Sequence, residues 1–175
     1  MALRWMTYEP HTYVRVTDRV VYRWIQAWRQ GGGALASVVE LRETKALAGI
    51  VEVSIAPHGA ILGFIFSRSY WRVGYAAEAV KAVIDVAFES FHVWRVWATC
   101  ATENEPSRPV LEKCRLEVEG TLRRWVVSPL VSPIPRDSFC VAITKEEWLT
   151  QGSLPRGSIE NPVLTPHNPS TALTQ

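Results

Sequence analysis

The sequence predicts an α/β fold in which helices flank a mixed sheet. Its predicted elements run in the order helix, three strands, helix, strand, helix, strand, strand. Short turns join the first three strands, which is typical of an antiparallel meander, and the helix that follows them makes a βαβ crossover. A meander that leads into a crossover gives a mixed sheet covered by helices. We assign this domain to residues 1–149 and expect residues 150–175, which lack periodicity, to be a disordered tail.

Two segments have the spacing of amphipathic helices. In residues 17–28 apolar side chains recur on one face, Thr17 is a candidate N-cap, and the glycines at 31–33 end the helix. Residues 74–91 form the strongest predicted helix, with charged side chains opposite an apolar stripe. The stripe that we expect to be buried consists of Val80, Val83, Ile84, Ala87 and Phe91.

The strands are predicted from apolar and β-branched runs that are bounded by turns. The third run, residues 60–66, is apolar on both faces, which is typical of a strand in the middle of a sheet. Gly63 within it indicates either a bulge or backbone that a ligand approaches closely. The proline-rich segment 128–135 is predicted to be a loop. The other predicted strands are residues 36–41, 48–55, 95–101, 118–127 and 138–143, and a short helix is predicted at 106–114.

Composition and charge exclude several classes of protein. The chain is 47% hydrophobic and 21% charged, which is typical of a soluble globular protein. Its net charge of +2 and the lack of a basic run argue against direct nucleic-acid binding. No apolar stretch approaches the roughly 20 residues that cross a bilayer, and the N-terminus lacks a signal pattern, so we expect a cytoplasmic protein with no membrane contact. The three cysteines are scattered, which argues against a disulfide framework or a thiolate metal site.

The junction between the third predicted strand and the long helix has the features of an anion site. A helix N-terminus presents unpaired amides at the positive end of the helix dipole. Gly74 would let the backbone approach a phosphate closely, and the small Ala76 and Ala77 leave room over the first turn. The alternative is that Gly74 only begins the helix.

This junction resembles motif A of the GNAT superfamily of N-acetyltransferases, which is written R/Q-x-x-G-x-G/A. The ribosomal-protein acetyltransferase (RimJ/RimL-like) group has a tryptophan at the first position, within W-G-x-G-Y-A-x-E-A. The chain departs from that pattern at Arg72, where the group has glycine, and this arginine would either touch a phosphate or project into solvent. The matching residues read Trp71-Arg72-Val73-Gly74-Tyr75-Ala76.

Further blocks follow in the family's order. Residues 104–113 resemble N-x-x-S-x-x-x-L-E-K, and residues 119–123 resemble E-G-x-x-R. Residues 136–138 and 145–148 resemble the R-D-S start of a late strand and the closing E-W. The resemblance implies the GNAT (acyl-CoA N-acyltransferase) fold, a mixed, mostly antiparallel central sheet flanked by helices. It also implies acetyl-CoA as the acetyl donor, with no metal.

The resemblance supplies roles for the coenzyme-binding residues. Strand backbone would pair with the pantetheine arm as an added strand does, and amides at the helix start would bind the pyrophosphate. Asn104 would hold the pantetheine or its loop, and Ser107 would protonate the leaving thiolate. The alternative is that Asn104 caps the short helix and Ser107 lies in its first turn. The expected coenzyme-binding residues are Phe64, Ile65, Phe66, Arg72, Val73, Gly74, Tyr75, Ala76, Asn104 and Ser107.

No motif marks the general base that must deprotonate the acceptor amine. Some relatives use a glutamate in the segment after E-G-x-x-R, where this chain has no carboxylate. The candidates elsewhere are Glu52, Glu103 and His58. Glu52 alternates with apolar and small residues along a strand and could face the acceptor, so it joins Ser107 as a catalytic candidate. The alternative is a solvated strand glutamate.

Two departures from the family pattern have structural consequences. Arg115 stands where the family has a glycine, and a left-handed conformation there would cost about 1 kcal/mol. The family also opens with a strand and a helix before the segment that residues 5–11 resemble. Either that first strand is missing here or the start is misplaced.

The expected reaction is direct transfer of acetyl from acetyl-CoA to a primary amine in a ternary complex. Positioning and stabilisation of the oxyanion would supply the rate acceleration. The acceptor would be a ribosomal or other protein N-terminus, or a small-molecule amine. The alternative is a catalytically inactive acyl-CoA-binding regulatory or scaffold module. Edge strands near the C-terminus pair in this family, so the resemblance also raises a homodimer.

Overall fold

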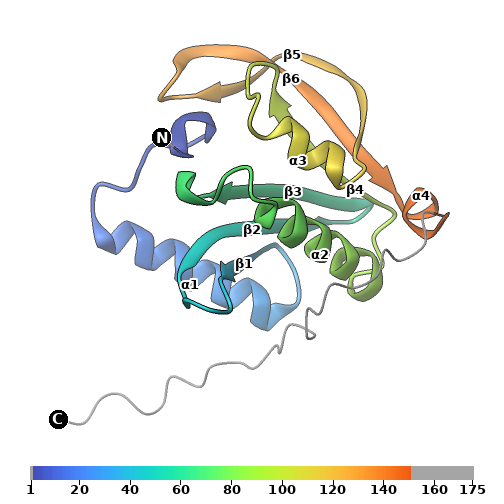
Figure 1. Ribbon diagram of the computed structural model, residues 1–175, viewed down its shortest axis with the longest axis horizontal. Helices are drawn as coiled ribbons and strands as arrows, with labels where there is room; N and C mark the ends of the chain where they lie inside the picture. The colour runs from blue at the N-terminus through green and yellow to red at the C-terminus, as the bar shows by residue number, and fades with distance from the viewer. Residues whose placement is uncertain (1, 151–175) are drawn as a thin grey trace, which may run out of the picture.

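The computed structural model describes residues 2–150, in which helices flank a six-stranded mixed sheet (Figure 1). The strands lie in the order β1-β2-β3-β4-β6-β5, and neighbouring strands are antiparallel except for the parallel pair β3 and β4. The predicted fold class and element order are confirmed, while the predicted tail falls outside the described residues. The strands are β1 (Ala34–Glu40), β2 (Leu47–Ala56), β3 (Gly59–Phe66), β4 (Arg95–Ala101), β5 (Glu117–Ser128) and β6 (Ser132–Thr144). The helices are η1 (Ala2–Trp5), α1 (Val14–Gln30), η2 (Arg68–Tyr70), α2 (Tyr75–Ser90), α3 (Arg108–Lys113) and α4 (Lys145–Thr150).

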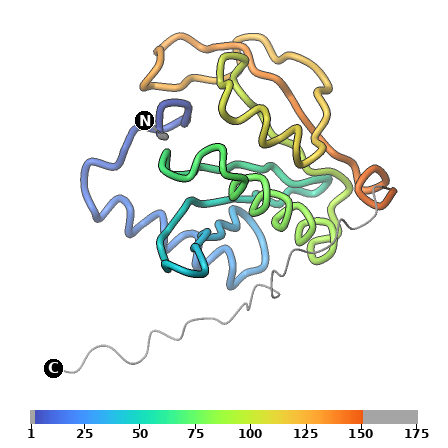
Figure 2. The backbone as a smooth tube through the Cα atoms, viewed as in Figure 1, coloured from blue at the N-terminus to red at the C-terminus, as the bar shows by residue number. Residues whose placement is uncertain are grey.

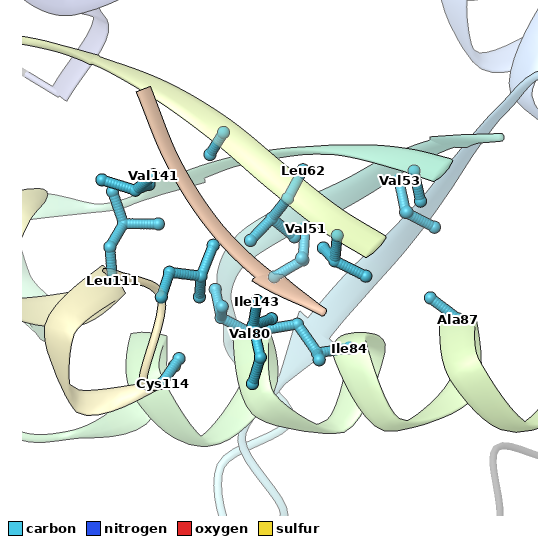
Figure 3. Packing of buried hydrophobic residues seen from close by; sticks show 14 of the residues in the cluster. Val51, Val53, Leu62, Val80, Ile84, Ala87, Leu111, Cys114, Val141 and Ile143 are labelled. Carbon is cyan, nitrogen blue, oxygen red and sulfur yellow. The ribbon is translucent and has the colours of Figure 1, made fainter. Parts of the chain in front are cut away.

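Helix α2 packs on one face of the sheet and forms the main core with it (Figure 3). Its residues Val80, Ile84 and Ala87 are buried, as predicted. Val83 and Phe91 are only half-buried, and Phe88 is buried in their place. The Phe88 ring stacks on a tryptophan of α4 at a centroid separation of 5.1 Å, which fixes α4 against the same helix.

Helix α1 packs on the opposite face of the sheet. Along β2 the buried Val51 and Val53 face α2, so Glu52 between them points to the other side. The Trp24 side chain of α1 reaches this carboxylate, which places α1 on that side. The two faces therefore differ: one holds the apolar core, and the other carries a hydrogen-bonded carboxylate.

The predicted start of α1 is wrong by four residues, whereas its end is confirmed. The helix begins at Val14, and Thr17 lies within its first turn instead of capping it. The Thr17 hydroxyl is hydrogen-bonded to His11 Nδ1 at 2.8 Å, so it is not free to cap. Gly31 ends the helix in the left-handed conformation, at φ 69°, which glycine adopts without a Cβ penalty.

The predicted loop at 128–135 is also wrong, because β6 already begins at Ser132. The ladder between β4 and β6 ends at Ala101 and Ser138, so the first part of β6 has β5 as its neighbour on one side only. Prolines are tolerated in a strand that lacks a second neighbour, since no ladder hydrogen bond is lost there. Pro133 and Pro135 therefore lie in a long β5–β6 hairpin that extends past the rest of the sheet.

The N-terminal segment lies against this hairpin (Figure 2). The Ser128 hydroxyl donates to the carbonyl of Trp5 at 3.4 Å, and the Arg136 guanidinium lies 5.8 Å from the centroid of the Trp5 ring. No strand precedes α1 within residues 2–150, and β1 forms one edge of the sheet. None of the helices in this part of the chain is both long and apolar enough to span a bilayer.

Replacing Arg115 by glycine is expected to stabilise the fold by about 1 kcal/mol. Arg115 follows α3 with φ 61°, so the left-handed conformation expected from the family's glycine is confirmed. The amide of Leu116 donates to Leu111 and that of Arg115 to Glu112, which is a Schellman ending. Urea unfolding of both proteins measures the gain, and an unchanged or lower midpoint would show that the arginine side chain compensates for its backbone.

Candidate active site

Strands β3 and β4 diverge halfway along their length. Their ladder consists of Ala60 with Val96 and Ile61 with Trp97. Beyond these pairs, residues 62–66 of β3 have only β2 as a neighbour, and residues 98–101 of β4 have only β6. The two strands are parallel, so both unpaired stretches lie at their carboxyl ends. We call this region the β3–β4 splay; it leaves backbone groups in the middle of the sheet available to a ligand.

The loop after β3 presents a row of free amides beside the splay. Gly74 is the N-cap of α2, with φ 102°, and no side chain caps the helix. The first amide of α2 that bonds back to the cap is that of Glu78, 3.1 Å from the Gly74 carbonyl. Within residues 2–150, no hydrogen bond uses the amides of residues 73–77. These five N–H groups and the positive end of the helix dipole form a site suited to an anion.

The Trp71 side chain holds this loop in place. Its indole N–H donates to the carbonyl of Phe66, the last residue of β3, at 2.9 Å. Tyr70 and Tyr75 pack edge to face next to it, with a centroid separation of 6.2 Å. The motif identified Trp71 but gave it no role, and the structure shows that it ties the free amides to the end of β3.

Arg72 occupies the left-handed conformation, with φ 64°, at the position where the related group has glycine. Its side chain is exposed and makes no ion pair with another described residue. The backbone of the motif is thus retained although the glycine is not.

Asn104 and Ser107 lie just beyond the end of β4. The Asn104 amide donates to Ala101 at 2.8 Å, and the Ser107 amide donates to the Asn104 carbonyl at 3.2 Å. Ser107 is the N-cap of α3 by position, yet its hydroxyl makes no capping hydrogen bond. The interpretation of Asn104 as the cap is wrong, and neither the Asn104 nor the Ser107 side chain caps α3.

The Asn104 side chain has an unused acceptor. Its Oδ1 is buried and has no hydrogen-bond partner among the described residues. Burying an amide oxygen without a partner costs about 1–3 kcal/mol. Such a cost is recovered when a bound molecule supplies an N–H group, which fits an amide-containing ligand at the end of β4.

Glu52 lies on the sheet face opposite α2, one strand away from the splay. Its Oε2 accepts a hydrogen bond of 2.8 Å from Trp24 Nε1. Its neighbour on β3 is Gly63, where an added Cβ would meet no atom within 4 Å. The β2–β3 ladder is continuous there, so the bulge considered for Gly63 is excluded.

The two other base candidates are less suited to proton transfer. Glu103 pairs with Arg136, whose Nε lies 3.0 Å from the carboxylate, and this hydrogen bond holds the pKa of Glu103 below its usual value. His58 is in the β2–β3 turn, at the opposite end of β3 from the splay. Glu52 makes no ion pair with any described residue. Of the three candidates, it is the one that is neither ion-paired nor at the far end of β3.

Tyr8 and Trp24 beside Glu52 were not predicted as site residues. Burial, and to a smaller extent the negative charge of Glu52, raises the pKa of the Tyr8 phenol. Both residues come from the N-terminal part of the chain, and Trp24 contacts Glu52 from the same face of the sheet. Neither belongs to a motif, so only the packing of α1 and the preceding segment could reveal them.

The cysteines do not form a nucleophilic or metal site. Burial raises the pKa of Cys100 to about 11 and that of Cys114 to about 12. Burial also raises the pKa of Cys140. Among the residues that the structure describes, no group of three histidine, cysteine or acidic side chains is placed to hold a metal ion.

Comparison with known proteins gives consistent relatives. Residues 2–117 match the model of the acetyltransferase (GNAT) domain. The chain is 30% identical over 126 residues to YnaD, an uncharacterized N-acetyltransferase of Bacillus subtilis, which covers 68% of this chain and 69% of YnaD. The structure of RimJ from Mycobacterium smegmatis in complex with CoA-disulfide is similar, with a TM-score of 0.67 and 28% identity over 81% of this chain and 70% of RimJ. The ribosomal-protein-S5-alanine acetyltransferase of Vibrio fischeri shares the fold, with a TM-score of 0.73 and 19% identity over 83% and 81% of the two chains.

Proposed function

Because the chain belongs to the GNAT acetyltransferase family and is an N-acetyltransferase that uses acetyl-CoA, we propose that it acetylates a primary amine by direct attack in a ternary complex. The acceptor is a protein N-terminus or a small-molecule amine. The observation that carries the proposal is the coincidence of the β3–β4 splay with the free amides of residues 73–77. The splay offers unpaired strand backbone, and the free amides offer an anion site next to the end of β3.

The donor is held along the open edge of β3. The backbone of residues 64–66 pairs with the pantetheine arm, as an added strand pairs with a sheet edge. The amides of residues 73–76 bind the pyrophosphate, with Arg72 beside them. Asn104 supplies its buried Oδ1 to an N–H group of the pantetheine. These contacts would direct the thioester toward the carboxyl end of β4, where Ser107 lies.

Glu52 acts as the general base. The acceptor arrives as an ammonium ion and gives one proton to the Glu52 carboxylate, directly or through a water molecule. The neutral nitrogen then attacks the thioester carbon. As the tetrahedral intermediate collapses, the C–S bond breaks, the nitrogen loses its second proton to solvent, and the sulfur takes a proton from the Ser107 hydroxyl. Solvent returns that proton to Ser107, so the products are an amide and free coenzyme A.

Direct attack is favoured over an acyl-cysteine intermediate. A cysteine nucleophile must be a thiolate, and the pKa of each of the three thiols is raised by burial. Acetyl transfer through any of them would therefore begin from a protonated, unreactive sulfur.

The proposal is tested by mixing the protein with acetyl-CoA and a panel of amines and following free thiol release. The panel contains peptides with different N-termini, polyamines and aminoglycosides. Thiol release that depends on one class of amine supports the proposal and identifies the acceptor class. Release that does not depend on any amine, or acetylation that proceeds through a labelled cysteine, would contradict direct transfer.

Replacing Ser107 by alanine is expected to lower kcat by roughly 10- to 100-fold, because the thiolate then leaves without a proton. The affinity for acetyl-CoA should change by less than about threefold, since the hydroxyl acts in the transition state. Ser67, which precedes η2 and is exposed, provides a matched control as Ser67→Ala. Equal rates for Ser107→Ala and the unmodified protein would remove Ser107 from the mechanism.

A further inference from the structure

We propose that Trp24 is a positioning residue for the general base: its indole N–H fixes the Glu52 carboxylate so that one oxygen faces the acceptor amine. This inference rests on the proposed function and adds to it a residue of α1 that no motif marks. The contact that carries it is the 2.8 Å hydrogen bond from Trp24 Nε1 to Glu52 Oε2, between partly buried groups. The bond links elements 28 residues apart in sequence, so it depends on the packing of α1 against the sheet.

The chemistry of the indole explains why it suits this role. An indole N–H can only donate, so it always contacts a lone pair of the carboxylate and never competes for the proton that Glu52 must accept. Because it engages Oε2, the second oxygen is left to take that proton. The tryptophan side chain has only two rotatable bonds, so its indole holds the carboxylate more rigidly than a long, flexible side chain would.

The surroundings of Glu52 leave few other groups to fix it. On its own face of the sheet, the neighbours across the ladders are Ala36 on β1 and Gly63 on β3, and neither carries a polar side chain. Ile50 and Ser54 flank it along β2, whereas α2 packs on the other face. The titratable group that senses its charge is the Tyr8 phenol from the N-terminal segment. Trp24 therefore makes the one hydrogen bond to the Glu52 side chain that the described residues contain.

The test is Trp24→Phe, with Trp28→Phe as the matched control. Trp28 lies one turn further along α1, is also partly buried, and donates its indole N–H at 2.7 Å to the backbone carbonyl of Ala36. Both variants keep an aromatic ring and lose one hydrogen bond, but only Trp24→Phe releases the carboxylate. We expect Trp24→Phe to lower kcat roughly tenfold with little change in KM for acetyl-CoA.

The Glu52→Gln background separates positioning from a structural effect. If Trp24 acts only through the carboxylate, Trp24→Phe should cause no further loss of kcat in Glu52→Gln. A structural defect would instead lower kcat by the same factor in both backgrounds. A further loss of kcat in the double variant, or equal losses in Trp24→Phe and Trp28→Phe, would overturn the proposal.

A readout without turnover separates this inference from the proposed function. In a ¹⁵N–¹H spectrum, the indole resonance of Trp24 should move when Glu52 is replaced by alanine, which removes the acceptor, whereas that of Trp28 should stay. A Trp24 resonance that is unchanged in Glu52→Ala would show that the indole does not hold the carboxylate. If the unmodified protein acetylated no amine, the proposed function would fail, and the indole resonance alone would then decide whether Trp24 holds Glu52.

Discussion

Replacing Gly74 by valine is expected to weaken acetyl-CoA binding by at least about 100-fold and to abolish activity with it. Gly74 has φ 102°, a conformation that a β-branched residue does not adopt without strain. An added Cβ at Gly74 meets no protein atom within 4 Å, so the new side chain would fill space over the free amides rather than clash with the core. Isothermal titration calorimetry with acetyl-CoA measures the loss.

Gly31 supplies the control for backbone strain. It is also left-handed, with φ 69°, an added Cβ there also meets nothing within 4 Å, and it ends α1 away from the β3–β4 splay. Gly31→Val should lose stability to a similar degree while it binds acetyl-CoA as before. Equal loss of binding in both variants would mean that strain alone explains the effect. Normal binding by a folded Gly74→Val would show that the amides of residues 73–77 do not hold the coenzyme.

Replacing Glu52 by glutamine is expected to lower kcat by roughly 100- to 1,000-fold, with acetyl-CoA affinity unchanged. Glutamine has the same shape, and its side-chain oxygen can still accept the Trp24 hydrogen bond, so the fold should not change. It cannot accept the proton of an ammonium ion. The residual rate should therefore rise steadily with pH, as the free amine fraction of the acceptor increases.

Glu103→Gln is the matched carboxylate control. It removes an exposed ion pair with Arg136, and the net charge changes by the same amount as in Glu52→Gln. Exposed ion pairs contribute little to stability, so this variant should keep kcat within about twofold. A larger fall in Glu103→Gln than in Glu52→Gln would transfer the role of base to Glu103.

The order of the elements could be read from the sequence because local signals agreed. Three local signals each specify one kind of element: the apolar run of β3, the glycine that precedes α2, and the amphipathic stripe of α2. The errors arose where a neighbour decided the outcome. Pro133 and Pro135 are strand residues because β6 extends beyond the end of β4. Thr17 does not cap because α1 already begins at Val14, and its hydroxyl is bonded to His11.

The residues of the candidate site also fall into two groups, those marked by local motifs and those brought together only by the fold. Gly74, Asn104 and Ser107 could be proposed from the sequence because they lie in contiguous motifs of the family. The family glycine also pointed to the left-handed backbone at Arg115, whereas the same conformation at Arg72 was not predicted. The Trp24–Glu52 bond could not be found from the sequence, because it joins a helix and a strand whose relative placement is set by the whole sheet.

The most direct test of the account is backbone hydrogen exchange with and without coenzyme A. If the coenzyme lies along the open edge of β3, two sets of amides should exchange more slowly when it is bound: those of residues 73–77, and those of residues 64–66 that point away from β2. Each of these groups then has a hydrogen-bond partner or is shielded from water. Protection of both segments at saturating coenzyme A would support the placement of the donor. Saturating binding that left both segments unprotected would contradict it, and the site would have to be sought elsewhere on the chain.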